Sequence, residues 1–420
     1  MNLFERADDS LKATLATSRR FVLVLGLLTG VAALSVDMSL PSIPEMVRDL
    51  ATRMSVGQQV ISLFIFGVGV GQLPAGFMSD RYGRLPVLYA GVITFTAASA
   101  LTSMANQIEI VLAARFFQGV GASVGVVITR AIVRDVASGR QMARLMSSMV
   151  MIFTAVPMLA PIIGSFLASL FGWRMPYVAM AIFGLAMLHL IATVVPETHA
   201  PIRELHIARQ FGRSLREFFS HRQSIFGTLL VMLAAAGFIS MITTSAALII
   251  DIFGVPVRYF GFIFAIGGVG ILAGSSLNRM YLHYYSTLKM AGVGAAIMAI
   301  ASAQLLLIAW LGNAPLWWIW GCSSLYMVGV GFLLPNATSL ALDPVPKIAG
   351  TASSLVTALQ NLAGSLGSFA ASLIYDGSIA RIVIVIGLSG VGTAFAFFVL
   401  RRLILGNRPL HVSDDDVPTI

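Results

Sequence analysis

The chain has 420 residues, of which 57% are hydrophobic and only 11% are charged, and its mean hydropathy is +0.88. A water-soluble domain needs far more charged side chains to cover its surface. The formal net charge of +9 is spread over an apolar chain and does not indicate nucleic-acid binding. Composition therefore excludes an ordinary soluble enzyme and favours an all-α integral membrane protein.

Apolar stretches of about 20 residues recur along the chain, and an α-helix of that length crosses about 30 Å of hydrocarbon. Their interiors are poor in charge and rich in Gly, Ala, Ser and Pro, as expected where membrane helices pack closely. The sequence predicts twelve spans, at residues 21–40, 59–78, 85–104, 108–130, 146–170, 176–195, 224–249, 259–277, 288–311, 316–340, 351–374 and 379–405.

The two halves of the chain repeat each other. Residues 154–170 read TAVPMLAPIIGSFLASL and residues 357–373 read TALQNLAGSLGSFAASL, with ten identities in 17 positions. A shorter, degenerate match places Asn278 opposite Asp80. The repeat predicts a cytoplasmic segment, two six-helix bundles joined by a cytoplasmic linker, and a cytoplasmic tail, at residues 1–20, 21–195, 196–223, 224–405 and 406–420.

Basic residues indicate the orientation, because short cytoplasmic loops retain Lys and Arg. With the N-terminus inside, 21 basic residues lie on the inner side and five on the outer side, and Arg115 lies within the membrane. Both termini are therefore predicted to be cytoplasmic. The first 20 residues lack the apolar core of a signal peptide, so the first helix is expected to stay attached. The linker contains LHIARQFGRSLREFF, which is typical of an interfacial helix.

A hydrophilic hairpin, GFMSDRYGRLPVL, joins the second and third predicted spans. Asp80 is expected to interact with the positive end of the helix that starts near residues 350–351, and Arg84 with Asp135. These contacts would hold the inner ends of the helices together and close that side of the bundle. The alternative is a solvated loop whose charges only fix the topology. The gate residues predicted here are Gly76, Asp80, Arg81, Gly83, Arg84 and Asp135.

Asp37 and Arg115 are ionisable groups inside predicted spans, where a charge is costly. Asp37 lies about 24 Å along the first span from its inner end, and Arg115 lies about 10 Å from the outer end of the fourth. On antiparallel helices the two side chains lie at similar depth, where the guanidinium favours the carboxylate and desolvation favours the acid. The alternatives are an Asp37 that caps its helix and an Arg115 that forms a structural ion pair or clamps backbone carbonyls.

Two further sets of residues are predicted from position alone. Pro157 and Pro161 stand one turn apart in the fifth span, close to Gly164, and indicate a kink that serves either a gate or only packing. Polar and aromatic residues of the spans are candidates to line a substrate cavity. They are Gln118, Phe64, Phe153, Tyr326, Asn336, Gln360 and Asn361.

These motifs resemble those of the major facilitator superfamily. The hairpin is similar to the loop G-x-L-x-D-R-x-G-R between helices 2 and 3, with Met78 in place of Leu. RFFQGVGAS, from Arg115, resembles the helix 4 motif of the superfamily's proton-driven exporters. DMSLPSIPEM, from Asp37, resembles the end of helix 1 in twelve-helix drug:proton antiporters, and APIIG, from Ala160, their G-P-x-x-G element. TRAIVRDV and GWR are similar to the bicyclomycin-resistance branch.

The resemblance implies a proton-coupled antiporter that exports small amphipathic compounds or drugs across the cytoplasmic (inner) membrane. Asp37 is the expected proton carrier and Arg115 its regulator. Alternatives are a proton-coupled symporter that imports a metabolite, and a specific metabolite or siderophore exporter. We expect a lipid-embedded monomer with a small-molecule substrate, without enzymatic activity, metal or cofactor other than the coupling proton. The sequence does not name the cargo.

Overall fold

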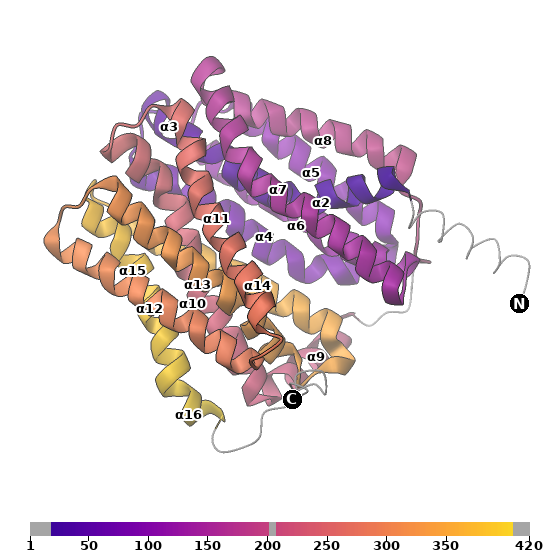
Figure 1. The fold of residues 1–420 in the computed structure, drawn as a ribbon. Helices are drawn as coiled ribbons and strands as arrows, with labels where there is room; N and C mark the ends of the chain where they lie inside the picture. Colours follow the sequence, from indigo (N-terminus) through magenta and orange to yellow (C-terminus); the bar gives the residue numbers. More distant parts are fainter. Residues whose placement is uncertain (1–17, 201–206, 406–420) are drawn as a thin grey trace, which may run out of the picture. The chain divides into compact units, whose positions relative to one another are not determined.

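The computed structural model describes residues 18–200 and 207–405, and these residues form helices joined by short connections (Figure 1). The predicted cytoplasmic tail, nearly all of the N-terminal segment and part of the linker lie outside the described residues. The elements are α2 (Arg19–Ser39), η1 (Leu40–Ser42), α3 (Ile43–Asp49), α4 (Met54–Tyr82), α5 (Arg84–Met104), α6 (Ile108–Val136), α7 (Gly139–Phe171), α8 (Met175–Val194), α9 (Ile207–Ser220), α10 (Arg222–Ala246), η2 (Ala247–Ile252), α11 (Val257–Tyr281), α12 (Thr287–Leu311), α13 (Leu316–Leu342), η3 (Pro346–Ile348), α14 (Ala349–Ile374), α15 (Ile379–Phe395), η4 (Ala396–Leu400) and α16 (Arg401–Leu405).

Within the described residues, eleven helical segments are long and apolar enough to cross a membrane. They correspond to every predicted span except the eleventh, residues 351–374. Its helix, α14, has 26 residues but carries many Ser and Thr side chains together with Gln360 and Asn361, which lower its hydropathy. The prediction of an all-helical protein with many spans is confirmed, whereas the count of twelve is not.

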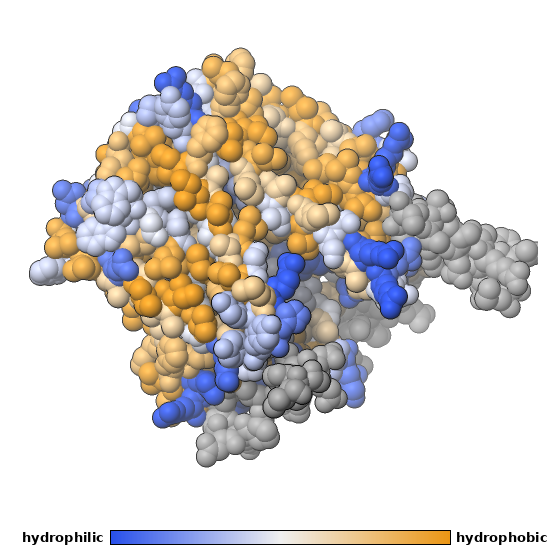
Figure 2. Space-filling model, viewed as in Figure 1, coloured by the Kyte–Doolittle hydropathy of each residue, from blue (hydrophilic) through white to orange (hydrophobic). Residues whose placement is uncertain are grey.

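The outer surface of the helices is apolar, as a lipid environment requires. Phe166 is 61% exposed, Trp310 82% and Leu388 59%. Figure 2 shows hydrophobic side chains over the flanks of the long helices, with hydrophilic side chains gathered mainly near helix ends. In water such a surface would aggregate, so its large apolar area marks contact with lipid.

The described residues divide into two compact units. The first comprises residues 18–42 and 67–200, and the second comprises residues 43–66 and 207–405. In the first unit, α2 packs against α6, α7 and α8, while α5 packs against α6 and α8. Aliphatic and aromatic side chains on the inward faces of these helices form its core, among them Phe21, Leu28, Leu88, Ile128 and Ile191.

The second unit is built around α10 and α13. The α10 helix packs against α13, α14 and α15, and α13 also packs against α11 and α12. A cluster of buried hydroxyls joins three elements of this unit: Ser368 Oγ lies 2.5 Å from Ser62 Oγ and 2.7 Å from Thr243 Oγ1. Ser365 Oγ also donates to Ser62 O at 2.8 Å, so these polar groups are satisfied without water.

The helices of the two halves repeat with a single spacing along the chain. The first residues of α2 and α10, of α4 and α11, and of α5 and α12 are separated by the same length of sequence. The two copies of the repeated 17-residue segment share this spacing, so the internal repeat extends over several helices. Asp80 lies in the last turn of α4 and Asn278 in the last turn of α11, and the predicted match of these two residues stays a prediction.

Equivalent glycines bring helices together in both units. A Cβ atom at Gly164 of α7 would collide with Met38 O and would lie 2.8 Å from Met38 Cα in α2. Gly367 of α14 is its counterpart in the repeat, and a Cβ atom there would lie 2.6 Å from Ala236 O in α10. Both glycines therefore pack directly against the backbone of a neighbouring helix, where no larger residue fits.

We expect Gly164→Ala and Gly367→Ala each to lower the free energy of unfolding by about 1–3 kcal/mol, because the added methyl overpacks a backbone contact. Gly268→Ala in α11 is the matched control, since nothing lies within 4 Å of its added methyl. Thermal unfolding of the purified protein measures the difference. Equal midpoints for all three variants would contradict the proposed close packing.

Candidate functional site

The junction between α4 and α5 is a single residue. The α4 helix ends at Tyr82 and α5 begins at Arg84, so Asp80 and Arg81 lie in the last helical turn rather than in a loop. The predicted hydrophilic hairpin is therefore mostly helical. Gly83 has a φ of 96°, which favours glycine, and this residue makes the whole turn.

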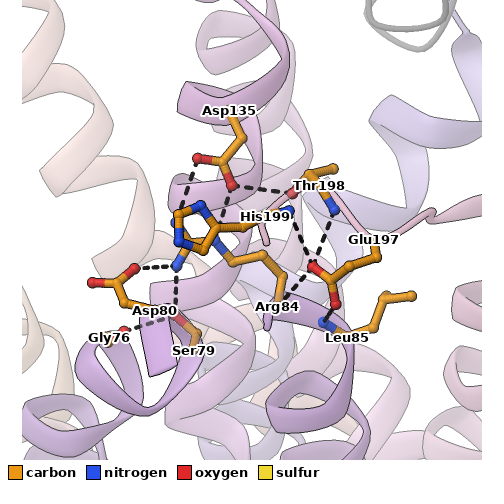
Figure 3. A network of polar contacts seen from close by, with 9 residues as sticks. All are labelled: Gly76, Ser79, Asp80, Arg84, Leu85, Asp135, Glu197, Thr198 and His199. Atoms are coloured by element: carbon orange, nitrogen blue, oxygen red, sulfur yellow. Dashed lines mark hydrogen bonds and ion pairs between the residues drawn. The ribbon is translucent and has the colours of Figure 1, made fainter. Parts of the chain in front are cut away.

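Arg84 connects the ends of α4 and α6 (Figure 3). Its Nε donates to Asp135 Oδ2 at 2.9 Å, and its Nη2 lies 3.4 Å from Asp135 Oδ1. Its Nη1 donates to Ser79 Oγ at 2.8 Å and to Asp80 Oδ1. The predicted contact of Arg84 with Asp135 is thus present in the geometry, while its role in a gate stays a prediction.

Burial makes this network stronger than a surface ion pair. The Arg84 side chain is 7% exposed, compared with 17% for Asp135 and 40% for Asp80. One largely desolvated guanidinium, held at several donor positions, fixes two carboxylates in defined geometry. The expected contact of Asp80 with residues 350–351 stays a prediction. Arg81 is exposed and lies over the ring of its neighbour Tyr82.

Glu197, which sequence reasoning missed, completes the network. Its Oε1 and Oε2 accept hydrogen bonds from the backbone N–H groups of Arg84 and Leu85, each at 2.9 Å. The carboxylate therefore caps the N-terminus of α5 and meets its positive dipole end. The following residue, Thr198, donates from Oγ1 to Asp135 Oδ2 at 3.0 Å. The segment after α8, predicted as part of a linker, thus holds both the start of α5 and the end of α6.

Arg115 is fully buried, and its guanidinium contacts the last turn of α2. Its Nη1 and Nη2 each lie 3.5 Å from Ser35 O, and Nη2 lies 3.3 Å from Ser39 Oγ. Its Nη1 also donates to Gln118 Oε1 at 2.6 Å, and its guanidinium lies 5.7 Å from the centre of the Tyr177 ring. These contacts match the predicted alternative of a carbonyl clamp.

The amide of Gln118 extends this polar cluster across the first unit. Gln118, which is fully buried, donates from Nε2 to Ser99 Oγ at 2.6 Å and lies 3.5 Å from Met180 Sδ. The chain from Arg115 through Gln118 to Ser99 links α2, α6, α5 and α8. Gln118 therefore joins neighbouring helices through its hydrogen bonds. This structural role is separate from its predicted place in a substrate cavity.

Asp37 lies in the same helical turn as Ser35 and Ser39 but on the opposite side. Two residues turn an α-helix by about 200°, so Asp37 lies roughly 160° from the face that contacts Arg115. Its side chain is buried, with the residue 5% exposed, and no described residue donates a hydrogen bond to its carboxylate or forms an ion pair with it. The expected approach of Asp37 to Arg115 is not seen in this structure, and the structure does not support capping by Asp37 either.

The remaining predicted residues lie on α4, α7, α13 and α14. The α7 helix continues through Pro157 and Pro161 without interruption, and Gly164 packs on α2. Phe64 is buried, Phe153 is 41% exposed, and Gln360 and Asn361 are half-buried.

Two of the cavity candidates are bonded within the second unit. Tyr326 donates from its hydroxyl to Ala234 O at 3.2 Å, and Asn336 donates to Asn278 Oδ1 at 2.7 Å. Both side chains are buried, and their polar groups hold α13 to α10 and α11. The substrate cavity stays a prediction.

Comparison with known proteins identifies the family. Residues 25–368 match the Major Facilitator Superfamily model. A bicyclomycin resistance protein homolog of Haemophilus influenzae is 29% identical, with 92% of this chain and 98% of that protein covered. Multidrug resistance protein D of Escherichia coli K12 is 31% identical, with 87% and 93% covered. A crystal structure of a D-xylose-proton symporter shares the fold at a TM-score of 0.72 and 18% identity, over 91% of this chain and 98% of that one.

The chain belongs to the Major Facilitator Superfamily, a family of membrane transporters. The predicted resemblance to this superfamily and to its bicyclomycin-resistance branch is confirmed by these relatives. It is a multi-pass membrane protein, and its family indicates a transporter of small molecules rather than an enzyme.

We expect Glu197→Gln to lower the free energy of unfolding by about 1 kcal/mol, because the amide loses one acceptor and the negative charge at the start of α5. Glu217→Gln in α9 makes the same charge change away from this network and serves as the control. Thermal unfolding in detergent measures both variants. If they unfold together, the carboxylate of Glu197 does not stabilise the junction.

Proposed function

We propose that this chain is a proton-coupled antiporter that exports small amphipathic compounds across the cytoplasmic membrane by alternating access. The observation that carries the proposal is the burial of Asp37 inside a membrane span without a hydrogen-bond or ion-pair partner among the described residues. A carboxylate without a partner is expensive in an apolar environment and becomes neutral by binding a proton. We therefore assign a protonated Asp37 to the buried arrangement.

Release of that proton requires water or a cation to reach Asp37. A change of conformation that hydrates the last turn of α2 would restore the carboxylate, so proton binding and release would follow the opening of the protein to each side. Arg115 holds the same turn through Ser35 and Ser39. We assign it the task of fixing the position of Asp37, through the backbone of α2 rather than by direct pairing.

The direction of transport is proposed from the relatives. The names of two similar proteins refer to bicyclomycin resistance and to multidrug resistance, and both match this chain over most of its length. Resistance by a transporter is most simply achieved by export of the compound. The D-xylose-proton symporter shows the shared fold alone, so import of a metabolite has no specific support here.

The proposal includes a twelfth span and a cytoplasmic location for both termini. The α14 helix is about 39 Å long at 1.5 Å per residue, enough to cross the hydrocarbon despite its polar side chains. Twelve spans in two bundles of six would follow from the sequence repeat that relates the two halves of the chain. In that topology the network around Arg84 lies on the cytoplasmic side, where we propose that it stabilises one closed state of a monomeric transporter.

We predict that Asp37→Asn abolishes uphill export in inverted vesicles while substrate binding and downhill exchange remain, because an amide cannot carry a proton. The substrate is first found by a thermal-shift screen of amphipathic cations and neutral drugs. Transport is then measured against imposed pH gradients of both signs. The exposed Asp376 provides the control Asp376→Asn, which is expected to transport normally.

Full uphill transport by the Asp37→Asn variant would remove this residue from the coupling mechanism. Accumulation of substrate on the same side as the protons would instead identify a symporter. Purified protein that moves no substrate in liposomes, although it binds ligands, would indicate a sensor.

We predict that Arg84→Ala slows turnover more than it reduces the amount of folded protein, because it removes the only guanidinium that joins Asp80 and Asp135 within the described residues. Exchange rates per folded molecule in vesicles measure the effect. Arg81→Ala, at the exposed neighbouring position, is the control. A normal exchange rate for Arg84→Ala would refute a gating role for the network.

A further inference from the structure

A groove of about 430 Å³ opens on the first unit between the beginning of α2 and the end of α8. Both helices are long and apolar enough to cross a membrane, and the groove lies at the start of α2 and in the last turns of α8. It is separate from the Asp37 turn and from the network around Arg84. It is lined by Arg20, Leu23 and Val24 of α2 and by His189, Leu190 and Thr193 of α8, with Val194 at the edge.

The polarity of the groove changes with depth. Arg20 is the second residue of α2, and Leu23 lies about 4.5 Å deeper along that helix. His189 lies five residues before the end of α8, or about 7.5 Å from it. Leu23 is 49% exposed and continues the apolar surface of the helices. A cation thus stands at the entrance, an imidazole lies further in, and aliphatic side chains lead toward the hydrocarbon.

The polar groups of the groove are available to a ligand. Thr193 Oγ1 donates to His189 O at 3.0 Å, so this hydroxyl is already used. Among the described residues, no side chain or backbone group forms a hydrogen bond or ion pair with the Arg20 guanidinium or the His189 ring, and both residues are exposed. Within the part of the chain that the structure describes, the groove therefore presents a guanidinium and, beside it, an imidazole ring.

We propose that this groove binds an anionic glycerophospholipid of the adjacent leaflet. The phosphate fits the Arg20 guanidinium, which donates charge-assisted hydrogen bonds to phosphate oxygens. An ester carbonyl, a few ångströms deeper in such a lipid, fits a donor N–H of the His189 imidazole. An acyl chain then continues along Leu23 and Leu190. Basic pockets between membrane helices near the surface are suited to anionic head groups in this way.

The test compares two lipids and two neighbouring arginines. Full-length protein is purified in detergent, and binding of phosphatidylglycerol and of phosphatidylcholine with the same acyl chains is measured by native mass spectrometry. We expect wild-type protein to prefer phosphatidylglycerol, and Arg20→Gln to reduce that preference about fivefold, as the loss of one basic contact near the membrane surface predicts. Arg19→Gln removes the same charge at an exposed position outside the groove and is expected to leave the preference unchanged.

Further variants separate the remaining explanations. Leu23→Trp fills the groove without changing charge and is expected to weaken binding of both lipids, which keeps the test independent of Arg20. Equal losses in Arg19→Gln and Arg20→Gln would refute the site in favour of diffuse attraction. Equal binding of the two lipids in wild-type protein would refute head-group recognition. Displacement of the lipid by glycerol phosphate at similar concentration would show a soluble phosphate ligand instead.

Discussion

A polar group inside a membrane span must find its partners within the protein, because hydrocarbon supplies none. Arg115 obeys this constraint through a carbonyl, a hydroxyl and an amide, and Gln118 carries the chain onward to Ser99. The hydroxyl groups of Ser62, Thr243 and Ser368 satisfy one another in the second unit. Among the described residues, the buried Asp37 carboxylate lacks such a partner, as do neutral groups such as the Gln58 amide. Asp37 differs from these groups because it can bind and release a proton.

The charged residues at the helix ends are stabilised differently from the polar groups inside the spans. Asp80, Asp135 and Glu197 surround one guanidinium and one helix terminus, where partial exposure to water lowers the cost of each charge. Asp80 and Arg84 are close in the sequence, whereas Asp135 and Glu197 lie 51 and 113 residues from Arg84. Their contacts fix the relative positions of α4, α5 and α6 at one face of the first unit. Within the described residues, Arg84 is the group that joins Asp80 to Asp135 in this arrangement.

Much of this organisation is visible in the sequence, because hydrophobic length and basic residues report directly on membrane spans. The contact of Arg84 with Asp135 was also expected. Glu197 was missed because it lies 113 residues from Arg84 and follows a helix, in a segment that resembles a solvated linker. The sequence predicts how deep Asp37 and Arg115 lie along their helices. It does not predict which side of each helix faces the neighbouring helix. Asp37 is two residues away from both Ser35 and Ser39, which Arg115 contacts, and it therefore lies on the opposite side of α2.

Gly83 is the only residue between α4 and α5, so the connection cannot absorb a change in length. Insertion of a single residue would rotate the start of α5 by about 100° and shift it by about 1.5 Å, enough to turn Arg84 away from Asp135. A longer loop would absorb such a change, but here the length of the connection is itself part of the site. Insertions and deletions should therefore be tolerated far less at this turn than at the C-terminal end of α5.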